Sequence, residues 1–163
     1  MNLQFYIEKL KNSEIFKKFM NENPDAFLCS GFFIIDKQGQ DNKQHFDFYL
    51  PKDKKIMSIQ LENMQLVPLE DFGRVPEKIS FEHDFDFEDV EKMILNEMEK
   101  QNINAKIQKM LFSLQNKDNK DFLVGTIFIS ALGMLKINID LQNMEITDFE
   151  KKSFFDIMKI KKK

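Results

Sequence analysis

The chain has 163 residues, of which 42% are hydrophobic and 31% charged, and its formal net charge is −3. This composition excludes an intrinsically disordered chain, a collagen-like repeat and a disulfide scaffold, and the length is typical of one domain. The acidic balance and the presence of only one arginine, Arg74, give no strong signal for nucleic-acid binding.

The location of the protein is predicted from what the sequence lacks. The lone Cys29 cannot form an internal disulfide, and the N-terminus contains no apolar core of a signal peptide. No apolar run reaches the roughly 20 residues that a membrane-spanning helix needs. We therefore expect a cytoplasmic protein, a single domain over residues 1–163, with no transmembrane segment.

The first part of the chain predicts two short helices followed by a strand. Apolar residues within 3–10 share one helical stripe, and this stripe breaks near Asn12. Ser13 is a suitable N-cap for a second helix, which Pro24 ends. Residues 26–36 are apolar on both alternating faces, which is typical of a central strand.

A meander of antiparallel strands is predicted next. Residues 46–50 and 57–61 alternate between apolar and polar side chains, with turn residues between them, and 64–67 continues as an extended piece. The stretch 68–78, which contains two of the four prolines, is the predicted linker.

After the linker, the pattern at residues 79–87 alternates and predicts an edge strand, followed by a helix that Asp86 caps. The spacing at 103–114 fits both a helix and a strand, and we favour the helix.

Two elements are predicted near the C-terminal end. A β-hairpin is predicted from residues 122–130 and 134–140, and a short amphipathic helix from 150–160.

A sequence repeat suggests internal symmetry. The segment IQLENMQL at 59–66 recurs as IDLQNMEI at 139–146, an offset of 80 residues. The fold class predicted is α+β, with an antiparallel sheet packed against helices and two duplicated αβββ units at 1–67 and 86–149. The alternative is convergence, because a strand, an asparagine turn and a strand are a common combination.

The segment GMLKINIDLQNMEI at 133–146 resembles the last strands of PepSY-type and cystatin-like αβββ units. The order of elements and the acidic charge are also similar to type III secretion chaperones. Either resemblance implies a non-enzymatic module that holds another polypeptide.

The densest set of candidate metal ligands is acidic. It consists of Glu82, His83, Asp84 and Asp86, and it suggests a metal-dependent hydrolase. The alternative interpretation is a solvated strand face that runs into a helix cap, because alternation would point His83 away from the carboxylates.

Other polar residues are weaker candidates for a catalytic site. His45, Asp47 and Tyr49 form a row that could move a proton, but no nucleophile accompanies them. Cys29 lies in an apolar strand and is predicted to be a packed thiol. The sequence contains no phosphate-binding or dinucleotide-binding glycine motif, so we expect no cofactor.

The C-terminal residues are basic, and Lys161, Lys162 and Lys163 are candidates for contact with RNA or a membrane surface, or simply solvated lysines.

Phe and Met together supply 28 residues, some of which can form adaptable contacts with proteins. The function predicted is a protein-interaction or chaperone-like module whose partner is another protein or a second copy. A metal-dependent hydrolase around residues 82–86 is the alternative.

Overall fold

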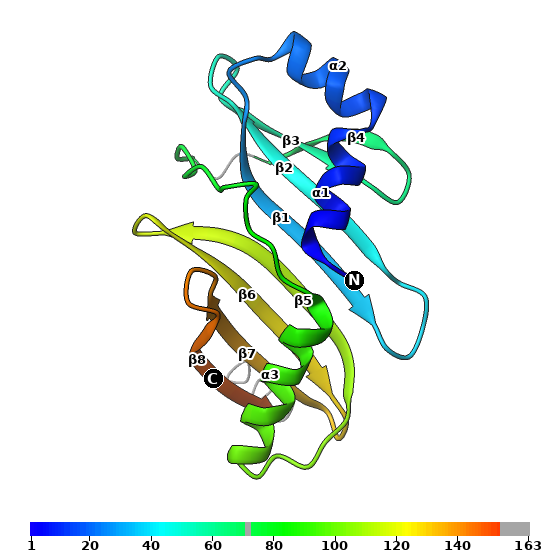
Figure 1. The fold of residues 1–163 in the computed structure, drawn as a ribbon, viewed down its shortest axis with the longest axis vertical. Coiled ribbons are helices and arrows are strands. Elements are labelled where there is room, and N and C mark those ends of the chain that lie inside the picture. The colour runs from blue at the N-terminus through cyan, green and yellow to red at the C-terminus, as the bar shows by residue number, and fades with distance from the viewer. Residues whose placement is uncertain (71–72, 154–163) are drawn as a thin grey trace, which may run out of the picture.

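The computed structural model describes residues 1–70 and 73–153 and confirms the α+β fold. In this part of the chain, eight antiparallel strands form one sheet and three helices pack on one face of it (Figure 1). The helices are α1 (Leu3–Lys11), α2 (Glu14–Glu22) and α3 (Phe87–Lys100). The strands are β1 (Phe27–Asp36), β2 (Lys43–Leu50), β3 (Lys55–Gln60), β4 (Gln65–Leu69), β5 (Ile107–Lys117), β6 (Lys120–Ile129), β7 (Gly133–Asp140) and β8 (Glu145–Ser153).

The two halves of the chain meet at the centre of the sheet. The strand order is β4-β3-β2-β1-β5-β6-β7-β8, so β1 and β5 form the central pair. From this pair, each half adds its remaining strands outward in chain order. Both halves therefore belong to one continuous sheet.

A polar side chain fixes the start of each helix. Asn2, Ser13 and Asp86 precede α1, α2 and α3, and each accepts a hydrogen bond from a backbone N–H of the first turn. Such a cap contributes about 1 kcal/mol. The predicted helix break near Ser13 and the predicted cap at Asp86 are both confirmed.

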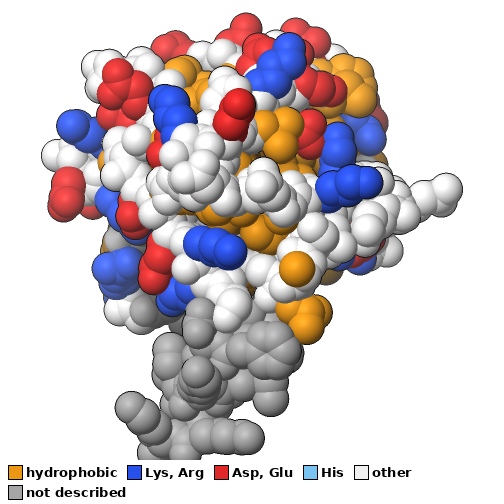
Figure 2. Space-filling model, turned by 90° about the horizontal axis from the view of Figure 1, so that it is seen from below, with side chains coloured by type: hydrophobic (Ala, Val, Ile, Leu, Met, Phe, Trp, Pro, Cys, Tyr) orange, Lys and Arg blue, Asp and Glu red, His pale blue; other side chains and the backbone are white. Residues whose placement is uncertain are grey.

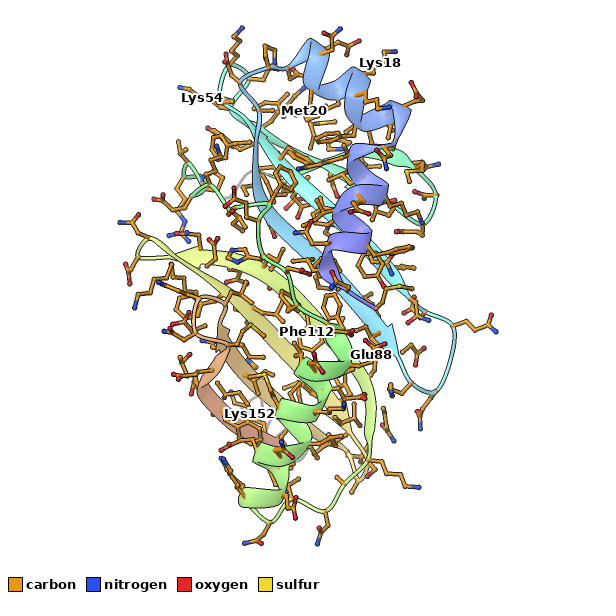
Figure 3. The ribbon with its side chains drawn as sticks, in the orientation of Figure 1. Lys18, Met20, Lys54, Glu88, Phe112 and Lys152 are labelled. Carbon is orange, nitrogen blue, oxygen red and sulfur yellow. The ribbon has the colours of Figure 1, made fainter. Side chains whose placement is uncertain are left out.

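Aromatic rings fill the space between the helices and the sheet. Phe33 of β1, Phe46 of β2 and Phe112 of β5 are almost completely buried. Phe87 of α3 packs on two of these rings, with its centroid 5.0 Å from that of Phe33 and 5.8 Å from that of Phe112. Figure 3 shows Phe112 under the start of α3, so this helix joins the strands of both halves.

The molecular surface mixes charges of both signs. In the view from below, charged side chains surround an area of apolar ones at that end of the molecule (Figure 2). A smaller apolar cluster of Cys29, Tyr49 and Ile56, with Phe27 against it, lies on the sheet face opposite the helices.

The predicted helix at 103–114 is wrong, because β5 begins at Ile107. Met110, Phe112 and Leu114 are buried in alternation, as one face of a strand requires. Strand β5 pairs with β1 on one side and β6 on the other, and a helix in this position would leave one edge of each of these strands unpaired.

The predicted edge strand at 79–87 is also wrong. Residues 78–83 form an extended segment whose backbone bonds elsewhere: Gln4 Nε2 donates to Phe81 O at 2.9 Å and to His83 O at 2.6 Å. The backbone N–H of Ile79 donates to Leu28 O at 2.8 Å. The alternation of this segment comes from apolar side chains, such as Ile79, that point into the core.

The predicted helix at 150–160 is wrong for residues 150–153, which belong to β8. The rest of that helix, with its proposed apolar stripe, lies outside the described residues.

In each half, helix precedes four strands rather than the three strands of the predicted αβββ units; the first half has two helices and the second has one. In both, the turn after the third strand contains a buried leucine, Leu61 or Leu141, and a methionine with φ of 51°, Met64 or Met144. The duplication itself stays a prediction.

Candidate binding cleft

A cleft of about 830 Å³ lies where residues 78–83 pass the tip of the β5–β6 hairpin. The end of α1 and the β7–β8 turn complete its rim. We call it the lysine cleft; its lining residues are Lys11, Lys78, Ile79, Ser80, Phe81, Glu82, His83, Asn116, Asn119, Lys120, Asp121 and Gln142.

The floor of the lysine cleft is a hydrogen-bonded network centred on Asp121. Its Oδ2 lies 2.6 Å from His83 Nε2 and accepts a bond from the Ser80 backbone N–H at 3.3 Å. Its Oδ1 accepts a bond from Asn116 Nδ2 at 2.8 Å. The side chains of His83 and Asp121 are only 20% and 13% exposed. The network therefore fixes the extended segment to the start of β6.

Asn116 is left with one group that lacks a partner. Because its Nδ2 donates to Asp121, the orientation of the amide is set, and Oδ1 points away from that carboxylate. Asn116 Oδ1 is buried and accepts no hydrogen bond. A buried acceptor without a donor costs about 1–3 kcal/mol, so Asn116 Oδ1 lowers the net stability that the network provides.

Three lysines give the cleft a positive rim. Lys11 Nζ lies 4.7 Å from the centroid of the Phe81 ring, a cation–π contact. Lys78 and Lys120 form no ion pair with any residue of the described part. Glu82 and Asp121 are the acidic residues of the lining, so the cleft carries a net positive charge in a chain whose total is −3.

The four predicted metal ligands do not converge. His83 pairs with Asp121, 38 positions away in the sequence. Asp86 caps α3 by accepting the Glu88 N–H at 3.0 Å. Within residues 1–70 and 73–153, no group of three or more His, Cys, Asp or Glu side chains could hold a metal ion. Metal binding by Glu82, His83, Asp84 and Asp86 stays a prediction without a converging ligand set.

A second His–Asp pair lies on the opposite face of the sheet. His45 Nδ1 is 2.8 Å from Asp47 Oδ1, and its ring stacks on Phe32 with centroids 5.1 Å apart. Ser58 lies across from Asp47 in β3, but its buried Oγ bonds to neither residue. This pair therefore has no activated nucleophile in the described part of the chain.

Cys29 is held as a neutral thiol. Burial, and secondly the charge of Asp47, raise the pKa of Cys29 to about 12. Its Sγ donates to Asp47 O at 3.4 Å. A thiol of this kind is a poor nucleophile near neutral pH.

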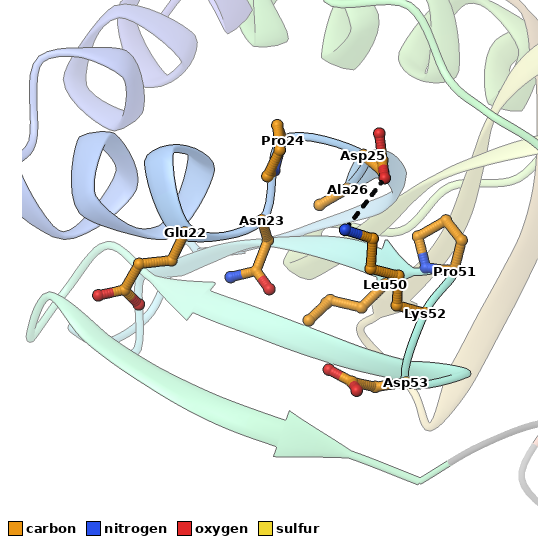
Figure 4. Close-up of a pocket in the computed structure, with 9 residues that line it drawn as sticks. All are labelled: Glu22, Asn23, Pro24, Asp25, Ala26, Leu50, Pro51, Lys52 and Asp53. Carbon is orange, nitrogen blue, oxygen red and sulfur yellow. Dashed lines mark ion pairs between the residues drawn. The ribbon is translucent and has the colours of Figure 1, made fainter.

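A smaller pocket of about 90 Å³ lies between the end of α2 and the β2–β3 turn. Figure 4 shows Lys52 reaching across its mouth to Asp25, with Nζ 3.7 Å from Oδ2. This volume is well below the roughly 300 Å³ of the smallest typical ligand sites.

The candidate residues Lys161, Lys162 and Lys163 lie outside the described residues. Within the described part, none of the helices combines the length and hydrophobicity needed to cross a membrane.

Comparison with known proteins identifies a shared fold and no family. No protein-family model matches the sequence, and no curated protein matches it. A crystal structure from Clostridium difficile 630, named "putative lipoprotein", superimposes with a TM-score of 0.53 at 15% sequence identity. The match covers 83% of this chain and 89% of the other chain. At this identity, the likeness concerns the fold alone.

Among the cleft residues, sequence reasoning found only Glu82 and His83 as candidates. Asp121 and Asn116 were missed because they belong to the β5–β6 hairpin, which is not predicted from the sequence. No local pattern connects Asp121 to His83. The antiparallel sheet brings them together.

Proposed function

We propose that this protein is a non-enzymatic interaction module that binds another polypeptide in the lysine cleft. The observation that carries the proposal is a pair of rim lysines, Lys78 and Lys120, which form no ion pair in the described part of the chain and lie on the rim of a cleft whose floor is held by hydrogen bonds. The volume of the lysine cleft, about 830 Å³, lies within the usual range of ligand sites. A floor held by hydrogen bonds needs little reorganisation when a partner binds, which favours affinity.

The arrangement of groups favours binding over hydrolysis. His83 uses Nε2 for Asp121, and no hydroxyl or thiol of the described residues bonds to its ring. Ser80 Oγ accepts the backbone N–H of Glu82 at 3.0 Å. A serine nucleophile needs a hydrogen bond to a general base, and this bond is not formed here.

Site-specific photo-crosslinking in native cells tests the proposal. A photoreactive residue replaces Gln142, which is exposed on the cleft rim, and in a matched control it replaces Asn96, which is exposed on α3. We expect defined polypeptide adducts from position 142 that are absent from position 96. An adduct of twice the chain mass would identify the partner as a second copy. Equal adducts at both positions, or no polypeptide adduct at position 142, would contradict the proposal.

A further inference from the structure

We infer that the sheet face opposite the helices is the interface of a dimer, in which it packs on the same face of a second copy of this chain. The inference concerns a different surface from the lysine cleft and does not depend on the proposed function.

An apolar patch lies on that face of the sheet. For each of its residues, the positions before and after it in the strand are buried or pack on the core, so alternation turns the residue itself away from the helices. We call it the central patch; it consists of Phe32 and Ile34 of β1, Leu111 of β5, Val124 and Phe128 of β6, and Met134 of β7.

Strand pairing joins the side chains of the central patch into one surface. Ile34 lies opposite Leu111, and Phe128 lies opposite Met134. Thr126 lies opposite Leu111 on its other side, and its small side chain leaves room for packing from above. The patch therefore extends across four neighbouring strands without interruption by a charged residue.

The central patch has no cover within residues 1–70 and 73–153. None of its residues packs against either hydrophobic cluster of this part of the chain. The three helices lie on the other face of the sheet (Figure 1). Phe128 is 39% exposed. An antiparallel sheet with one face in water normally alternates between apolar and polar side chains, whereas β1 is apolar on both faces. This pattern is typical of a strand with a packed layer on each side.

Polar side chains surround the central patch. The edge strand β8 turns Asp148 and Glu150 to this face, because they lie opposite the outward residues of β7. On the other side, Lys43 and His45 of β2 lie opposite Ile34 and Phe32. An apolar centre with a polar rim is the typical composition of a protein–protein interface.

The size of the face fits a second copy. With strands about 4.8 Å apart that rise about 3.4 Å per residue, an eight-stranded sheet of this length presents roughly 1,000 Å² on one face. The corner around Tyr49 and Ile56 is already buried. The remainder is close to the roughly 800 Å² that a standard interface buries on each partner. A single helix or strand of another protein would cover only part of this area.

The position of the central patch favours the same chain as the partner. Strands β1 and β5 are the central pair, so the patch lies near the middle of the sheet and the charged strand β8 lies at its edge. In a dimer with a two-fold axis, the surface near the axis contacts itself. Two copies related by an axis at the middle of the sheet would place apolar centre on apolar centre. Their sheets have the same twist, as aligned packing of two sheets requires.

Sedimentation of the purified full chain tests the inference. Interfaces of this size range in affinity from micromolar to picomolar, so the mass is measured between about 1 and 100 µM. We expect a species of twice the chain mass. A chain that stays monomeric throughout this range would overturn the inference.

Two variants place the interface on the sheet. Thr126→Lys puts an ammonium group into the apolar centre, and the fold should tolerate it because Thr126 is polar and partly exposed. We expect the dissociation constant of the dimer to rise about tenfold or more. L111Q/F128Q, which adds no charge, should act in the same direction. The matched control is Asn96→Lys, at an exposed position of α3, and it should sediment as the unmodified chain does.

Circular dichroism checks that each variant is folded. A dimer that a folded Thr126→Lys variant forms as strongly as the unmodified chain would use another surface, and this result would overturn the inference.

Photo-crosslinking from position 126 in native cells identifies what covers the face. We expect an adduct of twice the chain mass, in which position 126 is linked to the same face of the second copy. Links to residues 154–163 of the same chain, or to a different polypeptide, would assign the face to another occupant and overturn the inference. The adducts at position 142 test the proposed function separately.

Discussion

Replacement of Asp121 by alanine tests whether the network under the lysine cleft holds the extended segment in place. The carboxylate accepts bonds at 2.6, 2.8 and 3.3 Å from His83, Asn116 and Ser80. A hydrogen bond to a charged group contributes about 1.5–3 kcal/mol when buried, and less where water can replace it. Because His83 is partly exposed and the longest bond is weak, we expect the free energy of unfolding to fall by about 2–4 kcal/mol in total.

That loss leaves the protein folded, since domains are typically stable by about 5–15 kcal/mol. The expected decrease in Tm is roughly 5–15 °C for a chain of this size. The assay is urea unfolding followed by circular dichroism, with Asp148→Ala as control, because Asp148 is exposed on the edge strand β8. The control should change the free energy by less than about 0.5 kcal/mol. If Asp121→Ala costs no more than the control, the network does not secure the segment.

Three further predictions concern packing and titration. Gly125→Val would place a Cβ 2.8 Å from Ile137 Cγ1, so we expect a loss of about 1–3 kcal/mol in urea unfolding. Burial raises the pKa of Cys29 from 9.0 to about 12, so the folded protein favours the neutral thiol. The resulting contribution to the free energy of unfolding is complete below pH 9 and is lost as the pH rises toward 12. Unfolding measured as a function of pH would detect this loss. The side-chain hydrogen bond from Lys109 holds the pKa of Asp41 below its ordinary value, so Lys109→Met should raise that pKa in a carbon-detected NMR titration.

Each of these predictions has a control. A Val at position 125 that leaves stability unchanged would show that Ile137 moves aside freely. The variant Cys29→Ala should lack the thiol-dependent loss of stability above pH 9, and an identical pH profile would contradict the assignment. Lys18→Met, far from the carboxyl group, should leave the pKa of Asp41 where it is.

Local signals explain which elements the sequence predicts. A capping residue followed by a helical stripe is enough for α3, because Asp86 and the first turn act within a few residues of one another. The β6–β7 hairpin is predicted for the same reason, since its turn and alternation are local. These elements are confirmed.

The wrong predictions depend on distant contacts. The pattern around Met110 and Leu114 fits a helix as well as a strand, and the choice is made by β1, which lies about 80 residues earlier. At residues 79–86, alternation reports only which side chains enter the core. It contains no information on whether the backbone bonds along a neighbouring strand or, as for Phe81 and His83, to a side chain such as Gln4.

The candidate site is only partly accessible to sequence reasoning. His83 is identified by its residue type, but its partner Asp121 is supplied by the sheet. The unpaired Oδ1 of Asn116 has no signature in a sequence, because it depends on which way the amide is turned.

The central pair β1–β5 has a consequence for a divided chain. In this pair Phe32 lies opposite Ser113, and Phe33 lies opposite Phe112. Phe112 is the position 80 residues after Phe32, and Ser113 is the position 80 residues after Phe33. The two contacts are therefore related as symmetric contacts are across the interface of a two-fold symmetric dimer. Fragments cut between β4 and α3 would each expose a long, apolar strand edge, which is a template for aggregation. Expressed together, they should complement one another by re-forming this pair. The covalent linker then acts mainly to raise the effective concentration of one half around the other.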